Sequence, residues 1–184
     1  MKNNRITTIS KFLSKYLRHQ PEQLGLQLDV GGWVKVEDLL NASAKHNFPI
    51  SPSELEEVVA TNEKKRFSFD STGMLIRANQ GHSVEVDLQL EPVRPPDRLY
   101  HGTAEKSVEA IMQSGLQKMS RHHVHLSSER STAKAVGQRH GKPVIFSVDA
   151  ASMHKDGYLF YCSANQVWLV ECVPPEYLQK IDNT

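Results

Sequence analysis

The stretch Leu99-Tyr100-His101-Gly102-Thr103 determines how the second half of this 184-residue chain is expected to fold. Residues 99–101 have the composition of a strand. Gly102-Thr103 is expected to turn out of this strand into a helix over 104–114, with Thr103 as its cap. Glycine also lets a ligand approach the backbone closely, because it has no Cβ. The stretch therefore predicts a strand that leads into the start of a helix.

A second stretch, Arg121-His122-His123-Val124-His125-Leu126-Ser127-Ser128, predicts the same arrangement. Residues 124–126 are expected to form a short strand, and Ser127-Ser128 to open a helix over 129–140 that ends at Gly141. Strands that lead into helix N-termini and carry His, Thr, Ser and Arg suit phosphates and ribose hydroxyls. Strands over 144–148, 158–161 and 167–172 are expected to complete the sheet, followed by a short helix from Pro174.

Composition indicates an ordinary globular protein, with 39% hydrophobic and 23% charged residues. We expect a cytoplasmic protein, because there is no apolar run of roughly 20 residues and no signal-peptide core at the N-terminus. Cys162 and Cys172 are too few for a disulfide framework and are expected to be reduced. The net charge of +1 excludes no partner, since basic residues gather locally around Lys11 and Lys64.

The first half opens with an amphipathic helix. Its apolar residues recur at helical spacing and Pro21 ends it soon after His19. Lys11, Lys15 and Arg18 project from a neighbouring stripe, which on its own would be explained as a solvated charged face. Arg18-His19 lies at the C-terminal end, where the helix dipole favours cations.

The order of the following elements resembles that of a winged helix. A strand over 33–36 leads into a helix over 37–46. Ser51-Pro52-Ser53-Glu54 predicts a capping box at the start of a helix that runs to about Asn62. Two strands over 66–69 and 74–76 then form a hairpin. Winged helices bind nucleic acids and also serve in protein interaction.

A proline-rich stretch, Glu91-Pro92-Val93-Arg94-Pro95-Pro96-Asp97, separates the two halves. We therefore predict an α+β protein with a winged-helix-like RNA-binding lobe over 1–90, a linker over 91–98 and a second lobe over 99–184.

Five short motifs, taken in order, closely resemble the NAD-dependent RNA 2′-phosphotransferases, which include the tRNA 2′-phosphotransferases of tRNA splicing. The motifs are Leu17-Arg18-His19, Lys65-Arg66-Phe67, Tyr100-His101-Gly102-Thr103, the stretch 121–127 and Val167-Trp168-Leu169. The resemblance implies an N-terminal winged helix and a C-terminal ADP-ribosyltransferase-like lobe with a mixed β-sheet, with the active site between them.

The reaction that the resemblance implies removes an internal 2′-phosphate from RNA and uses NAD as co-substrate. The phosphate first attacks C1″ of the nicotinamide ribose and expels nicotinamide, which leaves a 2′-phospho-ADP-ribosylated RNA. The ribose 2″-hydroxyl then attacks the phosphate and releases RNA 2′-OH and ADP-ribose 1″,2″-cyclic phosphate. The implied partners are NAD and a tRNA-like RNA, and we expect the protein to act as a monomer.

The resemblance assigns roles to four basic residues. Arg18, Arg66 and Arg121 would hold the 2′-phosphate, since guanidinium groups pair with phosphate oxygens and stay charged. His19 would contact the phosphate and move a proton in the second step. Without the resemblance, Arg66 would be explained as a surface cation on a strand.

Five further residues match the family's NAD-binding elements. His101 would contact the NAD riboses, and backbone groups of Gly102 the nicotinamide amide, with Thr103 beside them. His125 would pack beside nicotinamide, and Ser127 would follow on the ribose side. Without the family match, His125 would be interpreted as a structural histidine.

No metal is expected, although His122, His123 and His125 lie close together in the sequence. Successive strand residues point to opposite faces, and no cysteine or carboxylate set completes a coordination shell.

Val167 stands where many ADP-ribosyltransferases carry a catalytic glutamate. A phosphate nucleophile is already anionic, so it needs no base; Glu171 is the rival candidate for that role. The chain departs from the family pattern at Asn165-Gln166, where glycine is usual before Val-Trp-Leu. Two alternatives remain: an ADP-ribosyltransferase that acts on terminal phosphates of nucleic acids, and a non-catalytic winged-helix binder that senses NAD.

Overall fold

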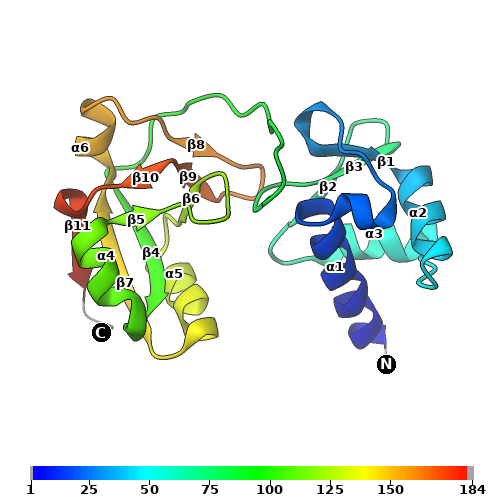
Figure 1. Ribbon diagram of the computed structural model, residues 1–184, viewed down its shortest axis with the longest axis horizontal. Helices are drawn as coiled ribbons and strands as arrows, with labels where there is room; N and C mark the ends of the chain where they lie inside the picture. Colours follow the sequence, from blue (N-terminus) through cyan, green and yellow to red (C-terminus); the bar gives the residue numbers. More distant parts are fainter. Residues whose placement is uncertain (1, 182–184) are drawn as a thin grey trace. The chain divides into compact units, whose positions relative to one another are not determined.

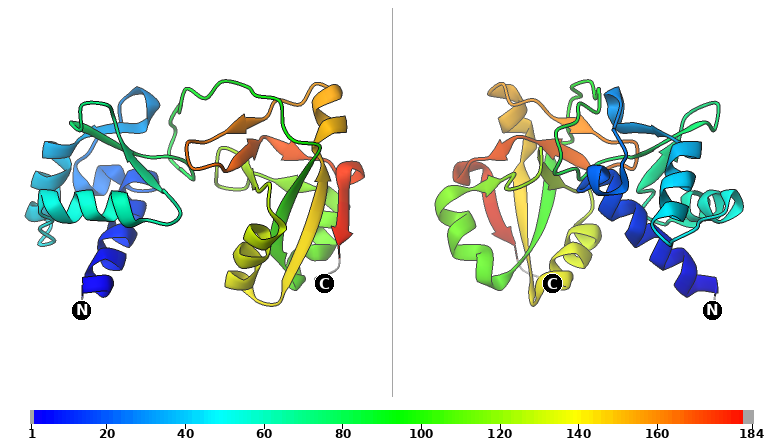
Figure 2. Two further views of the ribbon diagram at one scale, coloured as in Figure 1. Left: turned by 180° about the vertical axis from the view of Figure 1, so that it is seen from behind. Right: turned by 45° about the vertical axis from the view of Figure 1, so that its right-hand side comes forward.

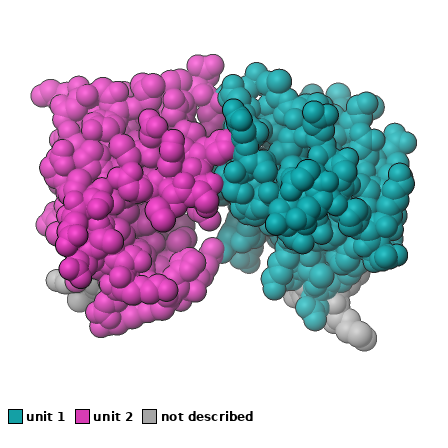
Figure 3. Space-filling view, viewed as in Figure 1, with its two compact units in different colours: residues 1–89 teal, residues 90–184 magenta. Residues whose placement is uncertain are grey.

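The computed structural model describes residues 2–181, with side chains from Asn4 onward. The chain forms two compact units, unit 1 over residues 1–89 and unit 2 over residues 90–184 (Figure 3). Both units combine helices with short antiparallel strands, which confirms the predicted α+β class. Within residues 2–181, no helix is both long and apolar enough to cross a membrane.

Within its described residues, unit 1 is built from three α-helices, two 3-10 helices and one small sheet (Figure 1). Its strands pair antiparallel in the order β1-β3-β2. The elements are α1 (Lys2–Arg18), the 3-10 helices η1 (Pro21–Leu24) and η2 (Val30–Gly32), β1 (Trp33–Lys35), α2 (Val36–Lys45), α3 (Pro52–Thr61), β2 (Phe67–Phe69) and β3 (Leu75–Ala78).

The core of unit 1 forms where α1 packs against α3 and the sheet. Ile9, Leu13 and Leu17 lie on one stripe of α1 and are fully buried, in one cluster with Leu55 of α3 and Ile76 of β3. This packing holds α1 in place up to its last residue, and η1 begins shortly afterwards at Pro21. The predicted helix at the N-terminus is therefore confirmed.

The predicted capping box at the start of α3 is also confirmed. The Glu54 N–H donates to Ser51 Oγ at 3.2 Å, and the Ser51 N–H donates to Glu54 Oε2 at 2.9 Å. Arg5 of α1 donates from Nε to Glu54 Oε1 at 2.9 Å, which ties the two helices together. These hydrogen bonds, that of Arg5 first, lower the pKa of Glu54 to about 2.

Unit 2 contains three antiparallel sheets, with strand orders β11-β7-β4, β6-β9-β8 and β10-β5. In Figure 2 the green β4 and the red β11 flank the yellow β7. The strands are β4 (Arg98–Ala104), β5 (Leu116–Gln117), β6 (Val124–Leu126), β7 (Pro143–Asp149), β8 (Tyr161–Cys162), β9 (Trp168–Val170), β10 (Cys172–Val173) and β11 (Leu178–Ile181). The helices are η3 (Glu105–Ser107), α4 (Val108–Ser114), α5 (Arg130–Gly137), η4 (Gln138–His140), α6 (Ala150–Lys155) and η5 (Pro175–Tyr177).

The predicted turn at Gly102-Thr103 is wrong. β4 continues to Ala104, because it pairs with β7 at every position from Arg98 opposite Asp149 to Ala104 opposite Pro143. A 3-10 turn follows, and α4 begins only at Val108, so Thr103 lies inside the strand and caps no helix. The ladder of backbone hydrogen bonds to β7 outweighs the local turn preference of glycine and threonine.

Other boundaries in unit 2 also differ from the prediction. Residues 158–160 are not a strand: the Tyr158 N–H donates to the Met153 carbonyl at 3.0 Å, just after α6, a helix that the sequence analysis missed. The helix expected over 129–140 divides into α5 and η4. A single 3-10 turn, η5, replaces the short helix expected from Pro174, and the unpredicted strand β11 follows it.

The proline-rich stretch has no regular secondary structure and is bound to unit 2. The Val93 N–H donates to the Phe160 carbonyl at 2.8 Å, and the Ala151 N–H donates to the Asp97 carbonyl at 3.2 Å. Pro95 is buried. The division between the units falls between Gln89 and Leu90, just before this stretch.

Candidate functional site

Arg18 and His19 lie where α1 ends, held by the segment that follows β3. The Arg18 carbonyl accepts from the Ser83 N–H at 2.9 Å, and His19 Nδ1 lies 2.9 Å from Ser83 Oγ. Arg18 as a whole is half-buried, but Nε and Nη2 of its guanidinium are buried, and Cζ lies 5.8 Å from the centroid of the Phe67 ring. Backbone and side chain of Ser83 thus fix the position of both predicted site residues.

Two asparagines that the sequence analysis missed hold Arg66. The Asn79 N–H donates to the Arg66 carbonyl at 2.8 Å, and Asn79 Nδ2 donates to the Lys65 carbonyl at 2.7 Å. Arg66 Nη1 donates to Asn62 Oδ1 at 3.5 Å. The half-buried Arg66 precedes β2 and directly adjoins Phe67, whose ring lies under Arg18. The role of Arg66 at the phosphate stays a prediction.

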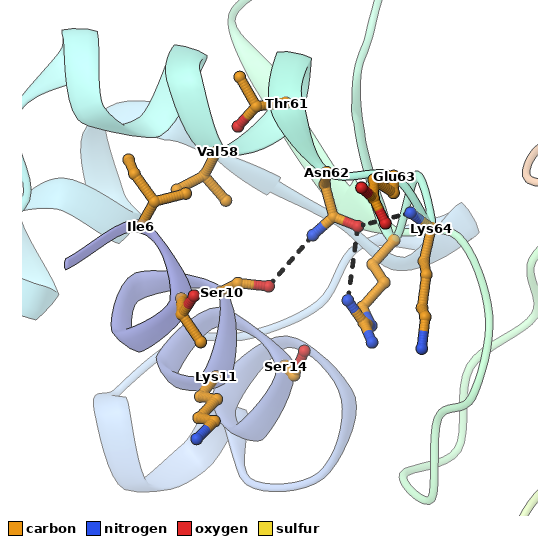
Figure 4. Close-up of a pocket in the computed structure, with 11 residues that line it drawn as sticks. Ile6, Ser10, Lys11, Ser14, Val58, Thr61, Asn62, Glu63 and Lys64 are labelled. Carbon is orange, nitrogen blue, oxygen red and sulfur yellow. Dashed lines mark hydrogen bonds between the residues drawn. The ribbon is translucent and has the colours of Figure 1, made fainter. Parts of the chain in front are cut away.

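Unit 1 also contains a pocket of about 410 Å³ between α1 and the chain that follows α3 (Figure 4). Arg66 lines it, together with Lys11 of α1 and Lys64. Asn62 lies at its wall, and the dashed lines in Figure 4 mark its hydrogen bonds to Ser10 and to the Lys64 N–H. The pocket thus extends from one of the predicted phosphate-binding residues.

In unit 2, His101 of β4 is tied to His125 of β6. His101 Nδ1 lies 3.0 Å from the His125 carbonyl oxygen, which can only accept, so Nδ1 carries the proton. In the neutral ring this leaves Nε2 as a hydrogen-bond acceptor. Burial lowers the pKa of His101, and repulsion from Arg121 adds to this, while the bond to the His125 carbonyl opposes it.

Arg121 lies beside the same pair. Its Nη1 is 3.1 Å from His125 Nδ1, and because guanidinium has no acceptor, this contact requires an unprotonated Nδ1 on His125. Ser127 closes the cluster through two backbone bonds with Tyr100: the Tyr100 N–H donates at 2.8 Å and the Ser127 N–H at 2.9 Å. Four predicted site residues, His101, Arg121, His125 and Ser127, therefore form one cluster at β4 and β6.

Gly102 has a packing role that the sequence did not indicate. A Cβ at Gly102 would lie 1.6 Å from the Ala133 carbonyl oxygen of α5. On the facing side, a Cβ at Gly137 would lie 2.7 Å from the Thr103 oxygen. Two glycines therefore let α5 lie directly against β4, which leaves Thr103 only 9% exposed. The predicted contact between Gly102 and nicotinamide stays a prediction.

Asn165-Gln166 precedes β9 and forms a turn, whereas Glu171 follows β9 and forms an ion pair. Glu171 forms an exposed ion pair with Lys118 at 3.2 Å. Asn165-Gln166 forms a tight turn, in which the Ser163 N–H donates to the Val167 carbonyl at 2.9 Å and Gln166 adopts a φ of 62°. Among residues 2–181, no three His, Cys, Asp or Glu side chains are grouped as metal ligands.

The nine predicted site residues are divided between the two units. Arg18, His19 and Arg66 belong to unit 1, whereas the other six belong to unit 2. Their convergence on one phosphate stays a prediction.

Comparison with known proteins gives the family. The profile described as "RNA 2'-phosphotransferase, Tpt1 / KptA family" matches residues 4–172. A protein of Nostoc punctiforme named "Probable RNA 2'-phosphotransferase" is 67% identical over 181 residues, covering 98% of this chain and 100% of that protein. One with the same name from Streptomyces griseus is 52% identical over 185 residues, covering 97% and 98%. The similar proteins are thus named as transferases that act on RNA 2′-phosphates. This chain belongs to the RNA 2′-phosphotransferase, Tpt1/KptA family.

Proposed function

We propose that the protein removes an internal 2′-phosphate from RNA, with NAD as co-substrate, and releases RNA 2′-OH, ADP-ribose 1″,2″-cyclic phosphate and nicotinamide. The observation that carries this proposal is the extent of the family match. It covers residues 4–172, which reach from unit 1 through most of unit 2 and include all nine candidate site residues.

Unit 1 then acts as a winged-helix lobe that binds RNA, and unit 2 as an ADP-ribosyltransferase-like lobe that binds NAD. The element order α1, β1, α2, α3, β2, β3 with a three-stranded sheet supports the first assignment. The cluster at β4 and β6 supports the second, since it presents imidazole, guanidinium and hydroxyl groups together.

The residues of this cluster fit NAD. His101 Nε2 accepts a hydrogen bond from a ribose hydroxyl, because the His125 carbonyl fixes the tautomer. The lowered pKa of His101 keeps this acceptor available at neutral pH. His125 carries its proton on Nε2 when Arg121 donates to Nδ1, and packs beside nicotinamide, with Ser127 on the ribose side. NAD supplies an electrophilic ribose carbon with nicotinamide as its leaving group.

The arginines act on the phosphate. Arg18, Arg66 and Arg121 bind its oxygens, which orients the nucleophile and neutralises its charge. The phosphate is already anionic and needs no general base, in keeping with Val167 at the position of the usual glutamate. His19 moves a proton in the step that transfers the phosphate from the RNA, since imidazole titrates near working pH.

One assay tests this function. An RNA with a single internal 2′-phosphate is incubated with and without NAD, and both RNA and nicotinamide are quantified. Conversion to RNA 2′-OH that requires NAD is expected. A product that retains ADP-ribose would instead indicate a transferase that stops after the first step, and no reaction at all would indicate a binder that only senses NAD.

A further inference from the structure

Most residues that line the pocket of unit 1 have charged or polar side chains (Figure 4). Lys11, Lys64 and Arg66 contribute three positive charges against one negative charge from Glu63, a net charge of +2. Its other lining residues are mostly hydroxyls and amides: Thr7, Ser10, Ser14, Thr61 and Asn62, with Ile6 and Val58 at the apolar part. Cations and hydroxyls together are the groups that bind phosphate and ribose oxygens.

Among the described residues that line this pocket there is no aromatic ring. Proteins that hold unpaired bases stack them on aromatic side chains. A pocket with cations but without rings therefore suits the sugar-phosphate backbone, irrespective of base sequence.

The wall of the pocket is held together by hydrogen bonds of Asn62. Asn62 Nδ2 donates to Ser10 Oγ at 3.1 Å, which joins the chain after α3 to α1. Asn62 Oδ1 accepts from the Lys64 N–H at 3.2 Å and from Arg66 Nη1 at 3.5 Å. This network fixes the backbone at Lys64 and the guanidinium of Arg66. These groups therefore lose less conformational entropy when a ligand binds.

The stripe of α1 that lines the pocket through Lys11 and Ser14 continues to Arg18. Lys11, Ser14 and Arg18 are spaced i, i+3 and i+7, so they lie on one stripe of the helix. Seven residues of α-helix span about 10 Å along the axis. A phosphate at Lys11 is therefore a different phosphate from the one at Arg18, and belongs to a neighbouring nucleotide of the same strand.

We propose that this pocket binds a backbone phosphate of the RNA one linkage beyond the nucleotide that carries the 2′-phosphate, a phosphate that a dinucleotide lacks, with Lys11 and Lys64 as its cations. This inference rests on the proposed function. It explains how RNA is distinguished from a small phosphorylated molecule, because only a chain of nucleotides places one phosphate at Lys11 and another at Arg18.

A second pocket in unit 1 provides a matched control. It is larger, about 650 Å³, and its lining includes two lysines, Lys35 and Lys45, and two aspartates, Asp29 and Asp38, so that its net charge is zero. Lys45 is an exposed lysine at the end of α2. Its removal changes the net charge of unit 1 without affecting the proposed subsite.

The test compares two substrates with the same 2′-phosphate, a dinucleotide and an RNA of about ten nucleotides. For the Lys11→Ala/Lys64→Ala double variant, KM for the longer RNA is expected to rise about threefold to tenfold. Its kcat and its KM for the dinucleotide should stay at wild-type values. The slope of log KM against log salt should fall by roughly 0.7 for each phosphate that the variant no longer binds. Lys45→Ala should behave as wild type, and Lys11→Arg in place of Lys11→Ala should restore binding.

Three outcomes would overturn the subsite: an unchanged KM for the longer RNA, an equal rise with Lys45→Ala, or an equal rise with the dinucleotide. Binding of an unphosphorylated RNA of the same length, followed by fluorescence anisotropy, needs no reaction. If wild type fails to remove the 2′-phosphate but binds this RNA through Lys11 and Lys64, the proposed function fails and the subsite stands.

Discussion

The carbonyl oxygen of Ala133 in α5 occupies the place that a Cβ on Gly102 of β4 would need, with only 1.6 Å between them. Helix and strand backbones are therefore in direct contact beside His101. The glycine of the motif Tyr100-His101-Gly102-Thr103 is thus required by the packing of unit 2, whatever it contacts in a ligand.

Gly102→Ala should destabilise unit 2 by about 2–3 kcal/mol, since the backbone of α5 would have to move. The change can be followed by Trp168 fluorescence in urea, in a Trp33→Phe background, because each unit holds one of the two tryptophans. Gly157→Ala is the control: its φ of 97° costs about 1 kcal/mol, but a Cβ there meets nothing within 4 Å. Equal losses at the two positions would contradict the packing argument.

Arg121 and His125 should act as a coupled pair. With Nη1 3.1 Å from Nδ1, loss of either side chain removes the same hydrogen bond. When losses of activity are expressed as free energies, the loss in the double variant Arg121→Ala/His125→Ala should therefore be smaller than the sum of the losses in the two single variants. The coupling free energy should be about 1 kcal/mol. Nicotinamide release from NAD at fixed RNA measures it; strictly additive losses would mean that the contact has no part in activity.

His101 should make the stability of unit 2 depend on pH. Its folded pKa lies below the ordinary 6.5, so the unfolded chain takes up the proton first as pH falls. The contribution of His101 to the free energy of unfolding of unit 2 is therefore fully present above pH 6.5 and declines as pH drops below that value. His101→Gln should flatten the decline in urea unfolding followed by Trp168. His123, whose pKa is also lowered by burial, remains in both proteins and cancels in the difference.

The capping box should make unit 1 sensitive to acid. The pKa of Glu54 falls from 4.5 to about 2 on folding, so its contribution is full above 4.5 and lost as pH falls toward 2. The pair with Arg5 is partly exposed, so about 1 kcal/mol is expected. Glu54→Gln should abolish this part of the acid response, measured by Trp33 fluorescence in a Trp168→Phe background. Ser51→Ala should lower the free energy of unfolding by about 1 kcal/mol already at neutral pH, because its hydroxyl caps α3 whatever the pH.

Arg18→Ala and His19→Ala should slow the second step of the proposed reaction more than the first. Both residues lie at the end of α1 and are held by Ser83, and the second step transfers the phosphate from the RNA. Build-up of ADP-ribosylated RNA in a time course is expected, while His46→Ala, at the end of α2, should show none. Equal slowing of both steps without build-up would contradict the assigned roles.

The elements that could be predicted from the sequence are those specified by neighbouring residues. The capping box at Ser51 and Glu54 and the helical stripe from Ile9 to Leu17 depend on contacts within a few turns of helix. The site residues came from short motifs, and the structure groups His101, Arg121, His125 and Ser127 within unit 2.

The errors arise where distant partners outweigh local preference. Gly102 and Thr103 look like a turn until β7 pairs with them, some forty positions later in the chain. Asn62 and Asn79 were missed because their side chains act on backbone and guanidinium groups brought near only by folding. Asn62, which follows α3 and accepts from the N–H two residues on, had a detectable signal in the Asx-turn pattern.

β7 has consequences for synthesis, because its two neighbours in the sheet come from opposite ends of unit 2. β4 emerges from the ribosome before β7, but β11 emerges well after it. Until then one side of β7 presents bare amide and carbonyl groups, a template on which another nascent chain can pair. Until β11 pairs with it, this edge of β7 is a site at which the folding chain is exposed to aggregation.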